Sequence, residues 1–77
     1  MSIQVKLFGA LADVVGQPEV QLQNINDTDS LKKKMVSDFP KLKTYSFVVA
    51  VYKKIANGNE VLSNGDVVAL LPPFAGG

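Results

Sequence analysis

The residues of this sequence that could do chemistry lie in its last stretch, PPFAGG, from Pro72 to Gly77. Gly76 and Gly77 have no Cβ atom, so their backbone can pass through a channel that rejects any side chain. They also leave the terminal carbonyl carbon open to attack. A free carboxylate is a poor electrophile, and it reacts once it carries a better leaving group, such as the phosphate side of an acyl-adenylate. The unhindered diglycine end suits that activation.

The residues before the two glycines have the properties of a stiff spacer. Pro72 and Pro73 favour an extended, polyproline-like chain, and six residues in that form span roughly 20 Å. Phe74 adds an apolar anchor partway along. A frayed terminus without any role is the alternative interpretation of a terminal Gly-Gly. The combination of an apolar strand, a rigid spacer, an aromatic residue and two glycines favours a tail that enters a cleft of a partner.

The composition excludes several classes of protein. The chain has no histidine, cysteine or tryptophan, so it lacks an imidazole base, a thiolate nucleophile and a soft metal ligand. We therefore expect neither a self-sufficient enzyme nor a metal site, and no permanently bound cofactor.

The net charge is +1, with no arginine, which argues against a nucleic-acid-binding protein. The lysines at positions 32–34 are interpreted as a solvated helix face, and Tyr45 and Tyr52 are assigned no chemistry.

The length and the N-terminal stretch predict a single domain in the cytoplasm. A chain of 77 residues makes one domain with a small core. The lack of cysteine suits a reducing compartment. MSIQVKLF does not have the layout of a signal peptide, and no apolar run approaches the roughly 20 residues that span a bilayer.

Hydrophobic periodicity predicts strands and helices along the first half of the chain. Apolar residues alternate with polar ones in residues 2–7 and again in residues 19–23, which indicates two half-buried strands. Between them, residues 9–16 fit a short helical segment bounded by glycines. An amphipathic helix follows, capped by Thr28 or Asp29, with its apolar stripe starting at Leu31. Pro40 is expected to end this helix near Asp38 or Phe39.

The second half of the chain predicts the rest of a sheet. Residues 46–52 form a β-branched, aromatic strand, residues 53–62 contain a possible weak strand, and residues 63–66 form a turn. Residues 67–71 are the last strand. We predict an α+β fold with a mixed sheet of four to five strands and one main helix on one face. The domain covers residues 1–71, and residues 72–77 form an extended tail.

The last strand is apolar on both of its sides. Val67, Ala69 and Leu71 point one way, and Val68 and Leu70 point the other way. One helix covers only one face of a sheet, so the other face needs a second cover. Either the segment of residues 9–16 folds over it or a partner does, and the sequence leaves both possibilities open.

The stretches KLFGALADVVG and SNGDVVALLPPFAGG, with the strand and helix order, resemble the small subunit of molybdopterin synthase, a ubiquitin-like β-grasp sulfur carrier. The resemblance covers essentially the whole chain. It implies that an activating enzyme of the ubiquitin-activating type adenylates Gly77 with ATP, and that a sulfur donor converts it to a thiocarboxylate. It further implies that the tail enters the large subunit, where its sulfur builds the dithiolene of molybdopterin from a cyclic pyranopterin precursor.

The resemblance also assigns roles to individual residues. The chain would be the subunit that donates sulfur within a larger enzyme, and Gly77 would carry the reacting group. Gly76 would allow the tail to pass. Residues expected to contact the partner are Phe74, Pro73, Pro72, Leu70 and Val68. One departure lies after the VAV strand, where related carriers often have Asn and this chain has Tyr52, which affects the turn at Lys53 and Lys54.

Three other functions remain open at this point. The thiamine-pathway sulfur carrier shares the fold and the Gly-Gly end, but usually lacks the double proline and this opening stretch. A non-covalent ubiquitin-like interaction module would use the apolar sheet face and would not need the glycines. A ubiquitin-like modifier would be joined through its C-terminus to lysines of target proteins.

Overall fold

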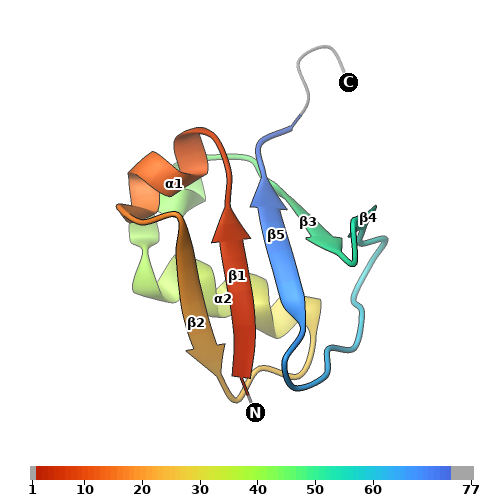
Figure 1. Cartoon of the computed structure of the whole chain (residues 1–77). Coiled ribbons are helices and arrows are strands. Elements are labelled where there is room, and N and C mark those ends of the chain that lie inside the picture. Colours follow the sequence, from red (N-terminus) through yellow and green to blue (C-terminus); the bar gives the residue numbers. More distant parts are fainter. Residues whose placement is uncertain (1, 74–77) are drawn as a thin grey trace.

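The computed structural model of the chain describes residues 2–73, and the domain is a mixed five-stranded sheet with helices packed against it (Figure 1). This is the α+β fold expected from the sequence, a ubiquitin-like β-grasp. The elements in chain order are β1 (Ser2–Leu7), α1 (Ala10–Val15), β2 (Glu19–Gln23), α2 (Thr28–Asp38), the 3-10 helix η1 (Pro40–Thr44), β3 (Val48–Val51), β4 (Lys54–Ile55) and β5 (Val67–Leu71).

The sheet is built around a central parallel pair of strands. The strand order is β2-β1-β5-β3-β4, and β1 and β5 are parallel while the outer pairs are antiparallel. Leu7 at the end of β1 is in register with Leu70 on β5. Because parallel strands end at the same edge of a sheet, the chain that follows β5 leaves the domain beside the chain that follows β1 (Figure 1).

Helix α2 lies across one face of the sheet and closes the core. Its apolar stripe places Leu31 and Met35 against the sheet, and both side chains are fully buried. The odd-numbered apolar residues of β1 and the even-numbered ones of β5 face the helix. This period of two on the strands and of about 3.6 on the helix is what the sequence pattern predicted. Leu11 of α1 is buried in the same core.

The N-terminus of α2 differs from the prediction by one or two residues. Asp27, and not Thr28 or Asp29, is the capping residue, and its side chain accepts a hydrogen bond from the backbone N–H of Ser30 at 2.8 Å. Thr28 is instead the first helical residue. Its buried hydroxyl accepts a hydrogen bond from the backbone N–H of Glu60. The Thr28 hydroxyl is thus used by a distant loop, which a local sequence pattern does not reveal.

The predicted end of α2 is confirmed, and a short helix follows that the sequence analysis did not predict. The helix ends at Asp38, and Pro40 begins η1. Proline suits this first position, because the N–H it lacks has no partner within a helix there. Leu42 of η1 is fully buried, so the 3-10 turn adds one more side chain to the core.

The strands after η1 are shorter than expected. The strand predicted for residues 46–52 forms only over Val48–Val51. The possible weak strand is real but covers only Lys54–Ile55. Between them, Tyr52 and Lys53 both have positive φ, 52° and 67°. Two central residues with positive φ define the type I′ turn that joins tight hairpins, and this turn ends β3 earlier than the apolar run suggested.

Neither α1 nor α2 covers the second face of the sheet. Helix α1 lies at the edge of the sheet and contacts η1 (Figure 1). Of the two covers that the sequence left open, the segment of residues 9–16 is therefore not the one. Within residues 2–73 this face is open, and we call it the open face. No helix in this part of the chain is long and apolar enough to cross a membrane.

Candidate functional site

The predicted tail begins at the edge of the sheet where β1 and β5 both end. Strand β5 ends at Leu71, and Pro72 and Pro73 are exposed and belong to no helix or strand. Phe74, Gly76 and Gly77, to which the sequence analysis assigned roles in the tail, lie outside the described residues. Pro72 has no N–H with which to continue the ladder with β1. The proline therefore ends the pairing at the point where the tail starts.

Gly9 packs against the first residue of the tail. A Cβ atom added to Gly9 would lie 3.2 Å from Cγ of Pro72, closer than side chains normally pack. Gly9 also has φ 59° and ψ −138°, a conformation that L-residues with side chains rarely adopt. In the register of β1 and β5, two residues beyond the pair Leu7 and Leu70 are Gly9 and Pro72. The bare glycine is thus what allows the proline ring to sit over the end of β1.

The two faces of β5 have opposite surroundings. Val68 and Leu70, which the sequence analysis expected to contact a partner, are fully buried in the core under α2. They have no exposed surface with which to make that contact, so this expectation is wrong. The physical reason is that β5 turns these two side chains toward α2. The opposite set, Val67, Ala69 and Leu71, points to the open face and is partly exposed.

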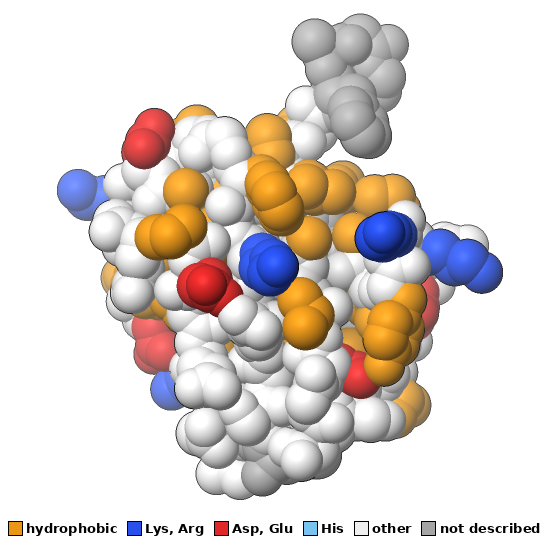
Figure 2. All heavy atoms as spheres, in the orientation of Figure 1, with side chains coloured by type: hydrophobic (Ala, Val, Ile, Leu, Met, Phe, Trp, Pro, Cys, Tyr) orange, Lys and Arg blue, Asp and Glu red, His pale blue; other side chains and the backbone are white. Residues whose placement is uncertain are grey.

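Apolar side chains continue from β5 onto the neighbouring strands of the open face. The register places Ala50 of β3 beside Ala69 of β5, and Ile55 of β4 beside Ala50. Ile55 is 49% exposed and Val67 is 40% exposed. Figure 2 shows apolar side chains gathered over the upper part of β5 and over β3. A contiguous apolar patch of this kind marks an interaction site more often than scattered apolar residues do.

A hollow of about 420 Å³ is sunk into this part of the open face. Its floor is apolar, its sides include two aromatic residues, and two lysines lie at its rim. The lining residues are Lys6, Phe8, Ala50, Tyr52, Lys53, Gly65, Val67 and Ala69. No carboxylate is among these residues, and their charged members are the two lysines. We call this hollow the open-face hollow.

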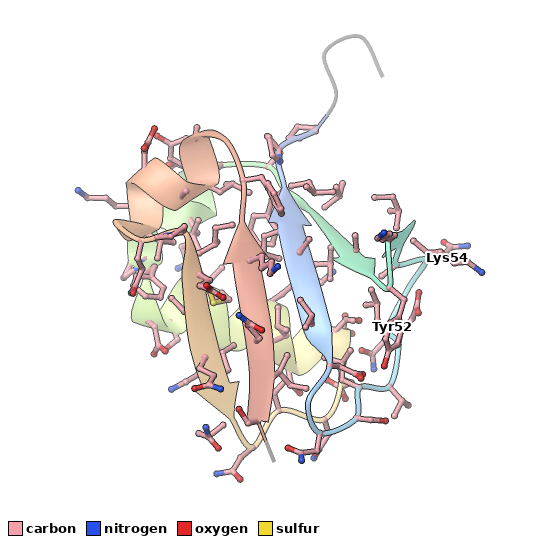
Figure 3. All side chains as sticks on the ribbon, viewed as in Figure 1. Tyr52 and Lys54 are labelled. Atoms are coloured by element: carbon pink, nitrogen blue, oxygen red, sulfur yellow. The ribbon has the colours of Figure 1, made fainter. Side chains whose placement is uncertain are left out.

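Tyr52 is held in place beside the hollow by a hydrogen bond to a carboxylate. Its hydroxyl donates to Oδ1 of Asp66, whose Oδ2 accepts the backbone N–H of Ser63 at 2.8 Å. Tyr52 lies at the turn between β3 and β4 (Figure 3). The hydrogen bond from Tyr52, with that from Ser63, lowers the pKa of Asp66. The same hydrogen bond and the negative charge of Asp66 raise the pKa of Tyr52.

Sequence reasoning missed Tyr52, although one signal pointed to it. The residue was noted as a departure from the Asn that related carriers often have, yet no role was assigned to it. Asn tolerates positive φ better than other residues with side chains. An aromatic residue at a position that favours Asn therefore indicates a side chain with a task of its own. Asp66 could not be linked to it, because 14 residues separate the two in the chain.

A second and larger hollow lies on the outer side of α2 and η1. Its volume is about 580 Å³, and Lys32, Lys33 and Lys43 line it together with Val36 and Pro40. The lysine run there makes exposed ion pairs with Asp29 and Asp38, at 3.9 and 3.3 Å, of the kind that contribute little to stability. This second hollow is on the side of α2 that faces away from the sheet, whereas the tail starts at the end of β5. We assign it no role.

The two carboxylates with lowered pKa values in the described part of the chain both serve the fold. Asp27 and Asp66, whose pKa values are lowered, both have carboxylates occupied by hydrogen bonds within the fold. The hydrogen bond from Ser30 is the main cause for Asp27. The apolar part of the open face lies beside the start of the tail, and the two together suit binding to a partner.

The fold and this site define a ubiquitin-like β-grasp domain whose open, partly apolar sheet face lies beside the start of its C-terminal tail. Residues 5–77 match the ThiS family, and the chain belongs to that family. It is 34% identical to the molybdopterin synthase sulfur carrier subunit of Mycobacterium tuberculosis, over the whole chain and 99% of that protein.

Two solved structures extend the comparison. The small archaeal modifier protein 1 of Haloferax volcanii is 27% identical with a TM-score of 0.81, and each chain is fully covered. A complex of subunits 1 and 2 of the molybdopterin-converting factor of Helicobacter pylori contains a chain that is 26% identical, with a TM-score of 0.74 and full coverage of both chains.

Proposed function

We propose that this protein is the sulfur-carrier subunit of a molybdopterin synthase and that it acts through the carboxylate of Gly77. The open face is apolar in the half formed by β5, β3 and β4, which we call the apolar half. The observation that carries the proposal is that this half lies beside the start of the tail, which ends in two glycines. This pairing gives a partner both a surface to bind and a chain end to receive. The full-length similarity to a sulfur carrier subunit supports the same function.

The proposed reaction begins with activation of the tail. The Gly77 carboxylate attacks the α-phosphate of ATP and displaces pyrophosphate, which leaves an acyl-adenylate. Hydrosulfide from a sulfur donor then attacks the carbonyl carbon and AMP leaves, which yields a thiocarboxylate. An activating enzyme of the ubiquitin-activating type performs the first step, and ATP is its substrate and no cofactor of this chain. The absence of a side chain on Gly76 and Gly77 keeps the carbonyl accessible.

The second part of the reaction takes place on the large subunit. The tail enters that subunit, and the thiocarboxylate sulfur attacks a carbon of the cyclic pyranopterin precursor and displaces an oxygen leaving group there. This gives a thioester between Gly77 and the precursor. Water then cleaves the thioester, which restores the carboxylate of Gly77 and leaves the sulfur on the precursor as a thiolate. Val67, Ala69 and Leu71 provide the apolar contact surface, in place of Val68 and Leu70, which are buried. The solved complex of two subunits in a relative of the same length supports such a large-subunit partner.

Mass spectrometry of the intact protein tests the activation step. After incubation with the activating enzyme, ATP and a sulfur donor, we expect a mass gain equal to the difference between a sulfur atom and an oxygen atom. A variant with one alanine added after Gly77 is the control and should gain no sulfur. Sulfur delivery to the pterin at a normal rate by the extended variant would contradict the proposal.

Protein modification is the second candidate, favoured by the likeness to small archaeal modifier protein 1. The same activated Gly77 would then be joined to lysines of other proteins. A denaturing gel of the native host's proteins separates the two functions. A dedicated sulfur carrier stays at its own mass, whereas a modifier produces conjugates of higher mass that disappear when Gly77 is deleted.

A further inference from the structure

Tyr52 is exposed and yet fixed in direction. It is 71% exposed, and an exposed side chain normally loses rotamer freedom only when a partner binds. Here the hydroxyl is already hydrogen-bonded to Asp66, which is 7% exposed and anchored to the backbone of Ser63. The ring is therefore oriented before any partner arrives. A rigid tyrosine supplies a large contact area at a low entropic cost.

The backbone at Tyr52 shows that this side chain is present against the local preference. Tyr52 and Lys53 both have positive φ in a two-residue turn, where Gly, Asn or Asp fit with less strain. The turn is held by the pairing of Val51 with Lys54. Strain of this kind persists where the surrounding structure holds it, and it clusters at functional sites.

The open-face hollow beside Tyr52 has a definite chemical character. Phe8 and Tyr52 provide aromatic sides, Val67 and Ala69 provide an apolar floor, and two lysines flank it. Neither Lys6 nor Lys53 forms an ion pair with any residue in the described stretch 2–73. Glu19 is in register opposite Lys6 and Asp66 bonds to Tyr52, but neither carboxylate lines the hollow. The charged residues of the lining are thus both lysines.

We propose that the open-face hollow receives an apolar side chain that the partner presents next to a carboxylate, and that Tyr52 determines which partners fit. This inference rests on the proposed function, because it specifies the chemistry of the surface that docks on the open face. The apolar floor fits the side chain, and Lys6 and Lys53 at the rim fit the carboxylate. Val67 and Ala69 line the hollow, so it forms part of the same apolar surface.

Binding of the cognate large subunit, measured by calorimetry, is the first test. Tyr52→Asn places a residue suited to positive φ in the turn and removes the ring. We expect a melting temperature within a few degrees of that of the wild type, because relief at the positive φ offsets the lost hydrogen bond to Asp66. The affinity should fall by roughly tenfold or more. If Tyr52 had only a structural role, the affinity would fall only when the melting temperature falls too. Lower affinity with unchanged stability therefore supports the proposal. Val61→Ala is the control, because Val61 is 85% exposed but does not line the hollow.

The charge of the rim is tested by Lys53→Glu. We expect weaker binding of the large subunit, with a dependence on salt smaller than that of the wild type, because the attraction to a partner carboxylate is lost. Wild-type affinity in both Tyr52→Asn and Lys53→Glu would overturn the proposal.

A small-molecule titration decides the same question without the large subunit. We expect phenylacetate to shift the NMR signals of Tyr52, Lys53 and Ala69 at lower concentration than phenylacetamide does, and phenethylamine to shift them least. Equal responses to the three probes, or responses elsewhere on the surface, would overturn the inference. If the wild type binds phenylacetate in the hollow but never gains sulfur at Gly77, the proposed function fails and the inference about the hollow stands.

Discussion

The two halves of the open face differ in composition although they belong to one sheet. The half formed by β1 and β2 carries polar side chains, namely Ser2, Gln4, Lys6, Glu19, Gln21 and Gln23. The half formed by β5, β3 and β4 carries Val67, Ala69, Leu71, Ala50 and Ile55. The boundary runs between β1 and β5, and β5 is the strand that leads into the tail. Apolar surface is thus left uncovered where the tail leaves the sheet, which is where a partner receiving that tail would bind.

The largest expected effect concerns the face of β5 that α2 covers. Leu70→Ala removes a fully buried side chain and should lower the free energy of unfolding by about 2–5 kcal/mol. Val67→Ala on the same strand should lower it by less than about 1 kcal/mol, because Val67 is already 40% exposed. Urea unfolding followed by circular dichroism measures both. Equal losses in the two variants would mean that the two faces of β5 are equally covered.

The contrast between the two halves is tested directly by placing the same residue in each. Val67→Lys puts a charge into the apolar half and should weaken binding of the large subunit by about 10- to 100-fold. Gln21→Lys puts the same charge into the polar half and should change the affinity by about twofold at most. Calorimetric titration of both variants gives the comparison. Similar losses in both would show that the partner does not distinguish the halves.

The link between the apolar half and the tail is tested at Gly9. Gly9→Ala should lower the free energy of unfolding by about 1–3 kcal/mol, because its backbone conformation disfavours a side chain and the new Cβ meets Pro72. Gly58→Ala is the matched control, since Gly58 also has positive φ but nothing lies within 4 Å of an added Cβ. Only Gly9→Ala should shift the NMR signals of Pro72. A shift of equal size in both variants would contradict the contact.

The smallest expected effect is the pH dependence due to Tyr52 and Asp66 at the edge of the apolar half. The pKa of Asp66 is lowered, so its stabilising contribution is present above about pH 4 and is lost as the pH falls through the lowered value. The pKa of Tyr52 is raised, so its contribution is present below about pH 10 and is lost as the pH rises through the raised value.

Tyr52→Phe removes the hydrogen bond and separates these contributions. Urea midpoints measured across pH should fall less steeply at alkaline pH in this variant than in the wild type. At acid pH part of the dependence should remain, because the pKa of Asp27 is also lowered, mainly through its hydrogen bond with Ser30. Identical pH profiles for the variant and the wild type would mean that the hydrogen bond does not contribute to stability in solution.

The sequence by itself determined the order of the main elements and where most of them end. Alternation in residues 2–7 and 19–23, the stripe from Leu31 and the stop at Pro40 are local patterns, and local backbone preferences act on them directly. The same reasoning identified the diglycine end and grouped Val67, Ala69 and Leu71 on one side of β5. It misplaced the cap of α2 by one or two residues, because Thr28 is used by a loop far away in the sequence.

Only the tertiary structure decided which side of β5 is buried. A strand that is apolar at every position alternates between two equal faces, so its pattern shows which residues share a face but not which face the helix covers. Packing of α2 made that choice, and it placed Val68 and Leu70 in the core. The hydrogen bond between Tyr52 and Asp66 likewise depends on a hairpin and a turn that meet in space. Interactions of this kind depend on which residues lie close together in space, and the spacing of residues along the chain does not show this.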